Sequence, residues 1–352
     1  MSLNVQQKTK PFKKLLIDLI HRNGPISLEN FMELCLTSKE GGYYLHQHPI
    51  GSESDFLTAP EISQMFGEII GLWFVDQWEQ LGCPSSFTFL ELGPGKGTLL
   101  HDILRSARIR PSFLDAIQIH LVEISPYFRD LQGKILQDFR INWHNSLDEA
   151  LQNLPHQPVF LLANEFFDAL PIQQFIKKED GWHERLVDFN SHSQTFCFVD
   201  GPLNKTITVD ASVGSVLESS PQTLKAIRDI AQALKKLGGV GIIIDYGYEE
   251  PYFGETIQAI ANHKHQEVLE NPGEHDLSAH VNFHELKEIF RDYPKFKIEI
   301  STQRNFLLRH GIVERTKILM KQKAKHTEEA LHRLVGLSEM GGLFKVLTLT
   351  PA

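Results

Sequence analysis

The residues best suited to chemistry are three glycines that follow an apolar, strand-like segment. The motif G-x-G-x-G comprises Gly93, Gly95 and Gly97, and a helix-like pattern begins directly after it. Glycines at a strand-to-helix turn let the backbone approach a nucleotide-type ligand without a Cβ clash. A dinucleotide fingerprint would place its third glycine one position later, where Thr98 stands. The spacing predicts a ligand loop of another kind, with a ligand-free tight turn as the alternative.

A carboxylate precedes this glycine motif by two residues. Glu91 ends the strand-like segment, and an acid there suits a ligand with a cationic head better than it suits a pyrophosphate. S-adenosyl-L-methionine (SAM) is such a ligand, because it carries an ammonium and a sulfonium. The pattern E-x-G-x-G-x-G resembles the first motif of class I SAM-dependent methyltransferases. The predicted cofactor contacts in this motif are Glu91, Gly93, Gly95 and Gly97.

A second strand-like segment, 116–123, also ends in an acid. In doubly wound sheets an acid at the second strand tip bonds the ribose hydroxyls, which is the role predicted for Glu123. A surface glutamate at a strand end is the alternative. Ser146 follows a short third strand-like segment, where the adenine edge would be met, and we expect it to contact the cofactor.

Polar residues follow a fourth buried segment, 159–163. Asn164, Glu165 and Asp168 all lie within five positions of its end. Ligands in open α/β sheets bind beyond the carboxyl ends of the strands, so we expect the two carboxylates to take part in the chemistry and Asn164 to contact the cofactor. The alternative is that Asn164 and Glu165 simply cap the next helix.

The N-terminal part carries another acidic segment, SDFLTAPEISQMFGE, which starts at Ser54. Thr58 and Glu61 have the spacing of a capping box and predict the start of a helix. Asp55 and Glu61 would then place two carboxylates at one helix N-terminus. Acids at helix starts are common because they complement the helix dipole, so a functional role and a purely capping role both stay open.

Composition places the chain among ordinary globular proteins. Its 352 residues are 41% hydrophobic and 22% charged, which suits one large domain with additions. A net charge of -9 argues against a nucleic-acid partner. The chain has no apolar run long enough to predict membrane insertion, and no signal peptide is visible. Its three cysteines show no pairing pattern, which favours a reducing, cytoplasmic compartment. Close histidine pairs such as His46-x-His48 lack a third ligand in register, so no metal site is predicted.

The order of the expected elements predicts an α/β fold with a Rossmann-like sheet. Strand-like segments alternate with amphipathic helices, and short alternating segments separated by turn residues predict inserted β-hairpins. We expect an N-terminal helical cap over residues 1–80 that contributes to the active site. The main domain would cover 81–352, with a β-hairpin insertion at about 172–210 and a helical insertion at about 311–340.

These segments together resemble one family more closely than the general class. The chain is similar to the MidA-type family of SAM-dependent methyltransferases along nearly its whole length. It departs from the family at Ser54, where glycine is usual, and at Asn282, where aspartate is usual. The matching segments are GPIS at Gly24, GYY at Gly42, DFLTAPEISQMFGE at Asp55, ELGPGKGTLL at Glu91, VEISP at Val122, ANEFFDALPIQQF at Ala163, IDYGY at Ile244, PGEHDLSAHVNF at Pro272, TQRNFL at Thr302 and MGGLFKVL at Met340.

The resemblance implies a class I methyltransferase sheet with an antiparallel last strand, an N-terminal helical region and insertions. It implies SAM as the methyl donor and S-adenosylhomocysteine as the product. The mitochondrial member of the family methylates an arginine of a complex I subunit. A protein substrate of that kind is therefore implied here. The implied compartment is the cytoplasm for a bacterial-type protein and the mitochondrial matrix for a eukaryotic one, and a homodimer is one option for the assembly.

An arginine acceptor would place particular demands on the carboxylates. A guanidinium is protonated in water, so carboxylates must grip it, localise its charge and aim one nitrogen at the methyl group. Glu165 and Asp168 are the first candidates for this role, Asp55 and Glu61 are the second, and His280 is a candidate proton relay. Two rival functions stay open, namely a small-molecule methyltransferase and a SAM-binding assembly chaperone.

Overall fold

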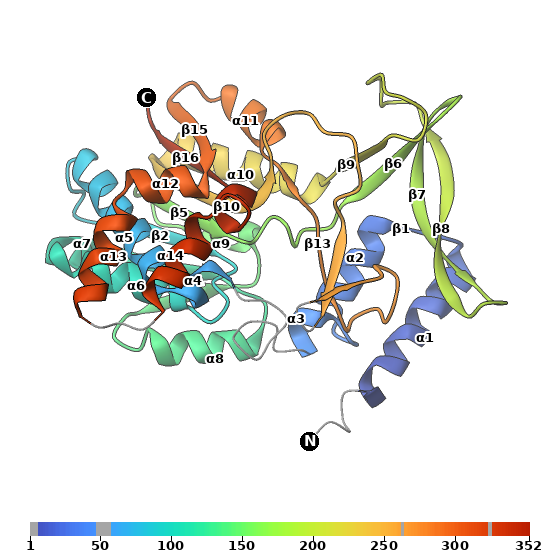
Figure 1. The fold of residues 1–352 in the computed structure, drawn as a ribbon, viewed down its shortest axis with the longest axis horizontal. Coiled ribbons are helices and arrows are strands. Elements are labelled where there is room, and N and C mark those ends of the chain that lie inside the picture. Colours follow the sequence, from blue (N-terminus) through green and yellow to red (C-terminus); the bar gives the residue numbers. More distant parts are fainter. Residues whose placement is uncertain (1–5, 47–57, 262–263, 323–325) are drawn as a thin grey trace.

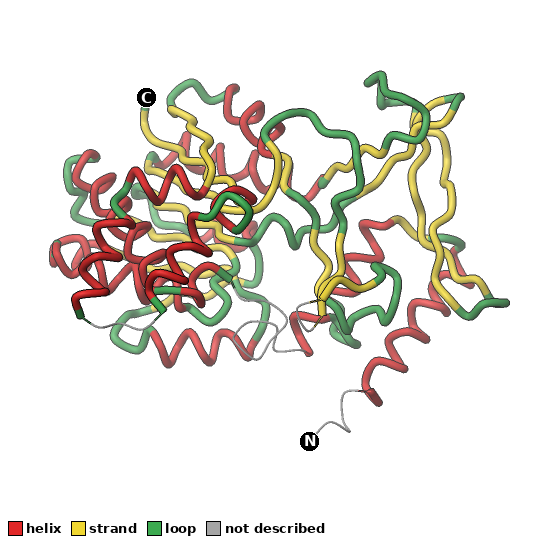
Figure 2. Tube along the Cα trace, viewed as in Figure 1, coloured by secondary structure: helices red, strands yellow, loops and turns green. Residues whose placement is uncertain are grey.

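The computed structural model describes residues 6–46, 58–261, 264–322 and 326–352. Two bodies lie side by side in Figure 1, a larger α/β body that contains the C-terminus and a smaller body that contains the N-terminal helix. Figure 2 shows helices on both faces of the sheet in the larger body, and long paired strands in the smaller one. Within these described ranges, no helix is long and apolar enough to cross a membrane.

An eight-stranded sheet forms the centre of the larger body. Its main path, from one edge to the other, is β15 (Phe296–Thr302), β16 (Phe344–Pro351), β10 (Gly239–Tyr248), β5 (Val159–Asn164), β2 (Phe87–Leu92), β3 (Ile117–Val122) and β4 (Ile141–His144), with β14 (Val281–Asn282) paired to β10. Neighbours from β10 to β4 are parallel, whereas β16 is antiparallel to both β10 and β15. The expected antiparallel last strand is therefore confirmed.

Strand side chains alternate between the two faces of this sheet, which gives it two cores. On β2, Phe87 and Phe89 join one core, while Leu90 and Leu92 join the other. The first core is covered by α5 (Gln64–Gln80), α6 (Thr98–Ser106), α7 (Pro111–Ala116), α12 (Gln303–Arg309), α13 (Ile312–Lys321) and α14 (Thr327–Val335). The second is covered by α9 (Leu147–Asn153), α10 (Pro221–Leu237) and α11 (Phe283–Arg291). The predicted α/β architecture is confirmed.

Shorter elements complete the connections of the larger body. They are α8 (Pro126–Ile135), which follows β3, the 3₁₀ turn η1 (Ala107–Ile109) and α15 (Met340–Leu343), which precedes β16. The helix α8 begins with proline at its first position, where the missing N–H costs nothing.

The smaller body combines the N-terminal helices with the predicted β-hairpins. Its elements are α1 (Gln6–Asn23), α2 (Leu28–Thr37), α3 (Tyr43–His46), and an antiparallel sheet of β1 (Ile26–Ser27), β7 (Gly181–Asn190), β6 (Gln173–Lys178), β9 (Val216–Ser219) and β8 (Thr195–Asn204). A second sheet contains β12 (Lys264–Gln266), β11 (Gln258–Ala261) and β13 (Asp276–Ser278). Phe12 and Phe31 of the helices share one core with Val187 and Leu277 of the strands. The hairpin insertion is confirmed, and this shared core fixes it against α1 and α2.

The hydrophobic cores group the N-terminal residues differently from the expected cap over 1–80. The helices α1 and α2 pack in the smaller body, whereas α5 contributes Phe66, Ile70 and Phe74 to the core of the large sheet. The division at residue 80 stays a prediction, and these contacts favour a boundary before α5.

The expected capping box at Thr58 is wrong. Thr58 precedes the four-residue helix α4 (Ala59–Ile62) but its side chain makes no capping hydrogen bond. The chain then extends at Ser63, whose φ is -165°, and the Ser63 hydroxyl accepts the Met65 N–H to start α5. The carboxylate of Glu61 is free of the helix end and points to other partners.

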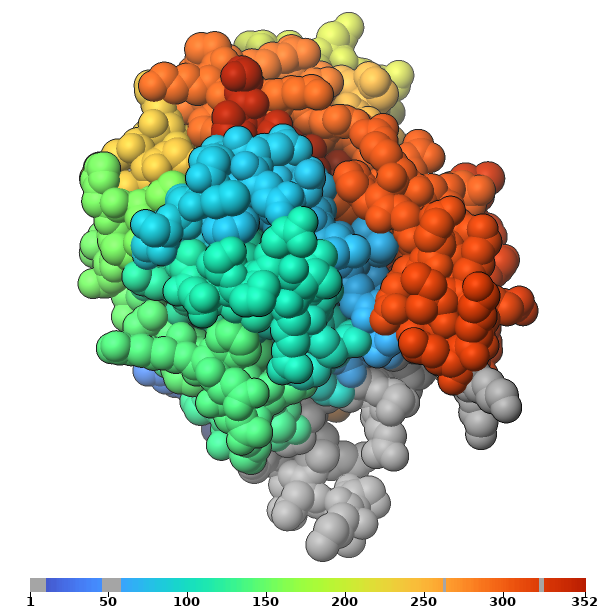
Figure 3. Space-filling model, turned by 90° about the vertical axis from the view of Figure 1, so that its left-hand side faces the viewer, coloured from blue at the N-terminus to red at the C-terminus, as the bar shows by residue number. Residues whose placement is uncertain are grey.

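The C-terminal helix α13 is joined to α5 by a buried carboxylate, which also binds α6. Glu68 accepts hydrogen bonds from Arg315 at 2.6 and 2.7 Å and from Arg105 at 2.8 Å. Glu68 is 5% exposed, so water screens this pair of contacts little. In Figure 3 the orange-red surface of the C-terminal helices lies against the blue surface of the N-terminal half.

Candidate functional site

The glycine loop joins β2 to α6 at the carboxyl end of the sheet. Gly93, Gly95 and Gly97 have φ angles of 60°, 53° and 84°, which glycine adopts at no steric cost. A Cβ on Gly93 would lie 2.9 Å from the ring of Phe166, so a side chain does not fit there. The predicted turn from a strand through glycines into a helix is confirmed, with Gly97 at the N-cap of α6.

Two buried glutamates lie near each other at the tips of β2 and β3. Glu91 is 2% exposed, and its Oε2 has no hydrogen-bond partner among the described residues. Burial, together with the nearby Glu123, raises the pKa of Glu91 to about 8. Burial raises the pKa of Glu123 to about 7, against hydrogen bonds that lower it. Such a pair is electrostatically suited to a cationic ligand, which would favour the ionised carboxylates.

A buried glutamine on α8 connects these groups to the glycine loop. The Nε2 of Gln132 donates to the Gly95 carbonyl at 2.7 Å and to Glu123 at 3.2 Å, while its Oε1 accepts from Trp143 at 2.8 Å. Glu123 also accepts the Ser125 N–H at 2.8 Å. The sequence analysis missed Gln132, because a single amide in an amphipathic helix carries no signal of its partners.

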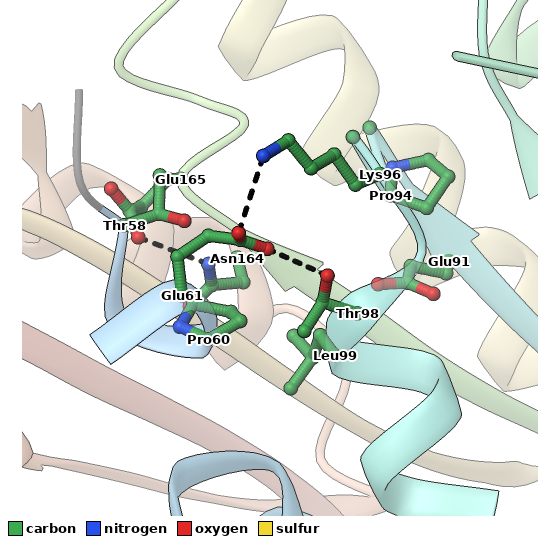
Figure 4. A pocket seen from close by; sticks show the side chains of 12 residues that line it. Thr58, Pro60, Glu61, Glu91, Pro94, Lys96, Thr98, Leu99, Asn164 and Glu165 are labelled. Carbon is green, nitrogen blue, oxygen red and sulfur yellow. Dashed lines mark hydrogen bonds and ion pairs between the residues drawn. The ribbon is translucent and has the colours of Figure 1, made fainter. Parts of the chain in front are cut away.

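An open pocket of about 420 Å³ lies between the glycine loop, the end of β5 and α4 (Figure 4). It brings together side chains from segments that are far apart in the sequence. Its lining residues are Thr58, Pro60, Glu61, Glu91, Gly93, Pro94, Gly95, Lys96, Thr98, Leu99, Asn164 and Glu165. The lining includes four of the predicted cofactor residues and two of the predicted catalytic residues.

The short helix α4 forms one wall of this pocket and contacts the glycine loop. The carboxylate of Glu61 accepts the Thr98 hydroxyl at 2.6 Å and lies 3.3 Å from the ammonium of Lys96, as Figure 4 shows. At the start of the same helix, the Ala59 N–H donates to the Glu165 carboxylate at 3.3 Å. The helix α4 therefore contacts both the glycine loop and the turn after β5 that carries Glu165 and Asp168, called the carboxylate turn below.

The turn after β5 holds Glu165 in a strained conformation. Its φ of 51° lies in the left-handed region, which costs a non-glycine residue roughly 1–2 kcal/mol. The Glu165 N–H donates to the Ile244 carbonyl at 2.9 Å, and the Asn164 amide donates to the Glu165 carboxylate at 3.2 Å. The Oδ1 of Asn164 is buried without a partner among the described residues. Strain of this kind is typical of positions where function requires a particular geometry.

Asp168 lies deeper in the same turn, beside two tyrosines. Its Oδ1 is buried with no partner in the described part of the chain, and Tyr246 hydrogen-bonds the carboxylate. The hydroxyl of Tyr44 donates to Asp276 at 2.9 Å. Burial, Asp276 and Asp168 raise the pKa of Tyr44. Burial raises the pKa of Asp168 to about 6, and burial together with Asp168 raises that of Glu165 to about 7.

A third buried carboxylate, Asp245 within β10, supports this turn. It is completely buried and accepts the backbone N–H groups of Phe167 and Asp168. The sequence analysis did not include it among the site residues. An acid following a buried strand in the segment IDYGY was the available signal.

The comparisons with known proteins agree with this geometry. The sequence model of the S-adenosyl-L-methionine-dependent methyltransferase family Methyltransf_28 matches residues 69–300. The protein arginine methyltransferase NDUFAF7 of Xenopus tropicalis, a mitochondrial protein, is 33% identical, over 96% of this chain and 85% of that protein. The NDUFAF7 homolog of Caenorhabditis elegans is 31% identical, over 98% of this chain and 87% of its own.

The chain belongs to the MidA-like family of SAM-dependent methyltransferases. SAM is therefore the cofactor of this methyltransferase, and S-adenosylhomocysteine is the product formed from it. The crystal structure of a Burkholderia thailandensis protein bound to S-adenosylhomocysteine matches the fold with a TM-score of 0.86 at 24% identity, over 99% of this chain and 94% of that one. The expected class I methyltransferase fold is confirmed.

The residues around the pocket fit this cofactor. The positive φ angles of the glycine loop leave its backbone accessible to a ligand. Glu91, whose Oε2 has no partner among the described residues, lines the pocket beside that loop. The unpartnered Oδ1 of Asn164 adds a second acceptor on the same lining. Acceptors of this kind suit the ammonium of a methionine moiety. The residues that would hold SAM are thus Glu91, Asn164 and the glycine loop.

Other predicted site residues lie outside the pocket lining. Ser146 uses its hydroxyl to accept the Glu149 N–H at 3.1 Å and so caps α9. His280 packs edge-on against Tyr246, with ring centroids 5.3 Å apart. Asp55 lies outside the described residues. The roles suggested for these residues stay predictions. In the described ranges, no group of three or more His, Cys, Asp or Glu residues could hold a metal ion.

Proposed function

We propose that this methyltransferase acts on the side chain of a protein arginine. The observation that carries the proposal is the pair of carboxylates, Glu165 and Asp168, on one turn beside the cofactor pocket. Relatives over almost the whole chain carry the name protein arginine methyltransferase. A guanidinium fits such a pair, because two carboxylates can accept its N–H groups in a fixed geometry.

When bound, SAM supplies an electrophilic methyl group on its sulfonium. Glu165 and Asp168 would grip the guanidinium, which localises its charge and leaves one nitrogen lone pair for the methyl group. The new N–CH₃ bond forms as the S–CH₃ bond breaks, and the sulfur becomes a neutral thioether. The methylated guanidinium must then lose one proton. Glu165 is suited to accept it, since its pKa of about 7 lies near the working pH.

The remaining candidates take different places in this proposal. Glu61, already bonded to Thr98 and Lys96, would hold the glycine loop instead of the guanidinium. Asp55 stays a second candidate for the acceptor grip, and His280 a candidate relay for the released proton. A respiratory complex I subunit or a similar protein is the proposed substrate. In a eukaryotic source the proposed compartment is the mitochondrial matrix, since the relatives are mitochondrial, and a homodimer stays one option.

The test separates cofactor binding from the choice of acceptor. Calorimetric titration with S-adenosylhomocysteine comes first, with Gly95→Arg as the variant that should lose binding. Methyl transfer from radiolabelled SAM is then measured on a pool of arginine-centred peptides and on the matched pool with lysine in place of arginine. We expect label in methylarginine only, lost in Glu165→Gln and reduced in Asp168→Asn. Label on the lysine pool, or full activity of both variants, would refute the proposal.

A further inference from the structure

The side chain of Asp245 accepts hydrogen bonds from the backbone of the carboxylate turn. Asp245 is 0% exposed, and one oxygen, Oδ2, accepts the N–H groups of Phe167 at 3.0 Å and Asp168 at 3.2 Å. Its other oxygen accepts the N–H of Tyr246 at 3.1 Å. A carboxylate that receives three backbone N–H groups fixes the backbone which supplies them.

The two strand ends that carry these groups lie side by side. β10 and β5 are parallel neighbours, with Ile244 paired to Asn164, so Asp245 follows the position that faces the start of the turn. The Ile244 carbonyl also accepts the Glu165 N–H at 2.9 Å. Consecutive residues of β10 therefore bind the backbone of the turn at Glu165, Phe167 and Asp168, which is how the left-handed conformation of Glu165 is maintained.

We propose that Asp245 is a positioning residue which fixes the backbone of the turn that carries Glu165 and Asp168. The functional consequence rests on the arginine acceptor proposed above, because the fixed turn holds both carboxylates in the geometry that a guanidinium needs. The fixing of the turn does not depend on that acceptor.

The charged and titratable groups around Asp245 come from three elements. Glu165 and Asp168 face it from the turn, and Tyr246 follows it on β10. Lys345 is its cross-strand partner on β16, but the Lys345 ammonium donates to the carbonyls of Gly342 and Leu343 at 3.1 and 3.3 Å. Burial, Asp168 and Glu165 raise the pKa of Asp245, so the three acids compete for ionisation as one coupled system.

The experiment is amide hydrogen exchange measured by NMR on the ¹⁵N-labelled chain, read at the N–H groups of Phe167 and Asp168. Asp245→Asn keeps an oxygen for these two N–H groups, whereas Asp245→Ala keeps none. We expect exchange at both groups to speed up at least tenfold in Asp245→Ala and much less in Asp245→Asn. Unchanged exchange in Asp245→Ala would overturn the inference.

A matched control and an activity measurement complete the test. Glu218 is also a buried carboxylate that accepts backbone N–H groups, from Thr256 at 2.9 Å and Ile257 at 3.3 Å, and Glu218→Ala should leave the exchange of the Phe167 and Asp168 N–H groups unchanged. In methyl transfer to the arginine peptide pool, Asp245→Ala should lose at least tenfold in kcat/KM and Asp245→Asn should recover most of it. Equal losses would overturn the positioning role. The NMR result needs no acceptor, so it stays decisive if the acceptor is not arginine.

Discussion

The hydroxyl of Thr98 donates a 2.6 Å hydrogen bond to the carboxylate of Glu61, 37 positions earlier in the chain. This contact joins the N-terminal helix α4 to the first residue of the helix after the glycine loop. The ammonium of Lys96 lies 3.3 Å from the same carboxylate. The Glu61 carboxylate thus binds the loop that is predicted to hold the cofactor, and α4, the helix that carries Glu61, also donates an N–H to Glu165.

Glu61→Ala and Thr98→Val should each weaken S-adenosylhomocysteine binding roughly 5- to 30-fold in calorimetry. A hydrogen bond to a charged group contributes about 1.5–3 kcal/mol when buried, and the partial exposure here reduces that to about 1–2 kcal/mol. Because both changes remove the same hydrogen bond and Glu61→Ala also removes the Lys96 contact, the double variant should bind about as weakly as Glu61→Ala alone. Fully additive losses would show that the contact does not act as a unit. The control is Glu79→Gln, because Glu79 forms an ion pair with Arg110 at the surface.

Gly93→Ala should lower the affinity for S-adenosylhomocysteine at least tenfold, whereas Gly214→Ala should leave it unchanged. Both glycines have positive φ, so both alanines should cost roughly 1–2 kcal/mol in the free energy of unfolding. Only the Cβ at position 93 meets a neighbour, the ring of Phe166 at 2.9 Å, while nothing lies within 4 Å at position 214. Calorimetry and thermal unfolding of both variants separate backbone strain from closure of the pocket. Equal affinity in the two variants would contradict this role of Gly93.

Glu91→Gln should stabilise the ligand-free chain at high pH and weaken its cofactor binding. Burial and Glu123 raise the pKa of Glu91 from 4.5 to about 8, so folding favours the protonated form. That contribution to stability is fully present below pH 4.5 and is lost as the pH rises through about 8, whereas glutamine stays neutral. The variant should gain about 4–5 kcal/mol at pH 9 and less than about 1 kcal/mol at pH 5. Thermal unfolding across this range checks the sign, with the exposed Glu33→Gln as the control.

The rate of methyl transfer should rise with pH through an acid limb near pH 7. Glu165 must be ionised to bind the guanidinium and accept a proton, and its pKa is raised to about 7 by burial and by Asp168. Asp168→Asn removes one neighbouring negative charge, so the acid limb should move to lower pH as the maximal rate falls. The measurement is kcat/KM from pH 5.5 to 9 on the arginine peptide pool. A limb that stays in place would assign the titration to another group.

Much of the fold could be predicted because its signals are local. The apolar run of β2, the glycines after it and the acids that follow β3 and β5 each lie within one short segment, so Glu91, Glu123 and Glu165 could be found from spacing alone. The inserted hairpins were recognisable from alternation and turn residues. These features depend on strand periodicity and on turn chemistry, which neighbouring residues determine.

The contacts that complete the site join distant segments and left no local signal. Ala59 and Glu165 are 106 positions apart, and the partners of Gln132 come from three different segments. The spacing of Thr58 and Glu61 predicted a local capping box, but tertiary hydrogen bonds to α6 and the glycine loop took the carboxylate instead. A left-handed φ at Glu165 is equally invisible in sequence, because it is imposed by β10 and not by the residue type.

Removal of the Glu68 charge should destabilise the packing of α13, and it should leave the pocket lining unchanged. Its carboxylate accepts hydrogen bonds from Arg105 on α6 and Arg315 on α13. Glu68→Gln would leave the partly buried guanidinium of Arg315 without its carboxylate partner, while Arg105 keeps its ion pair with Asp102 at 2.7 Å. Breaking a fully buried ion pair costs about 3–5 kcal/mol, and the partial exposure of both arginines reduces the expected loss to about 2 kcal/mol. Hydrogen exchange should then speed up in α13, because the contact that fastens this helix to α5 is weakened. The surface variant Glu79→Gln should change the stability by no more than about 0.5 kcal/mol, so equal losses in the two variants would mean that the buried network contributes nothing beyond a surface pair.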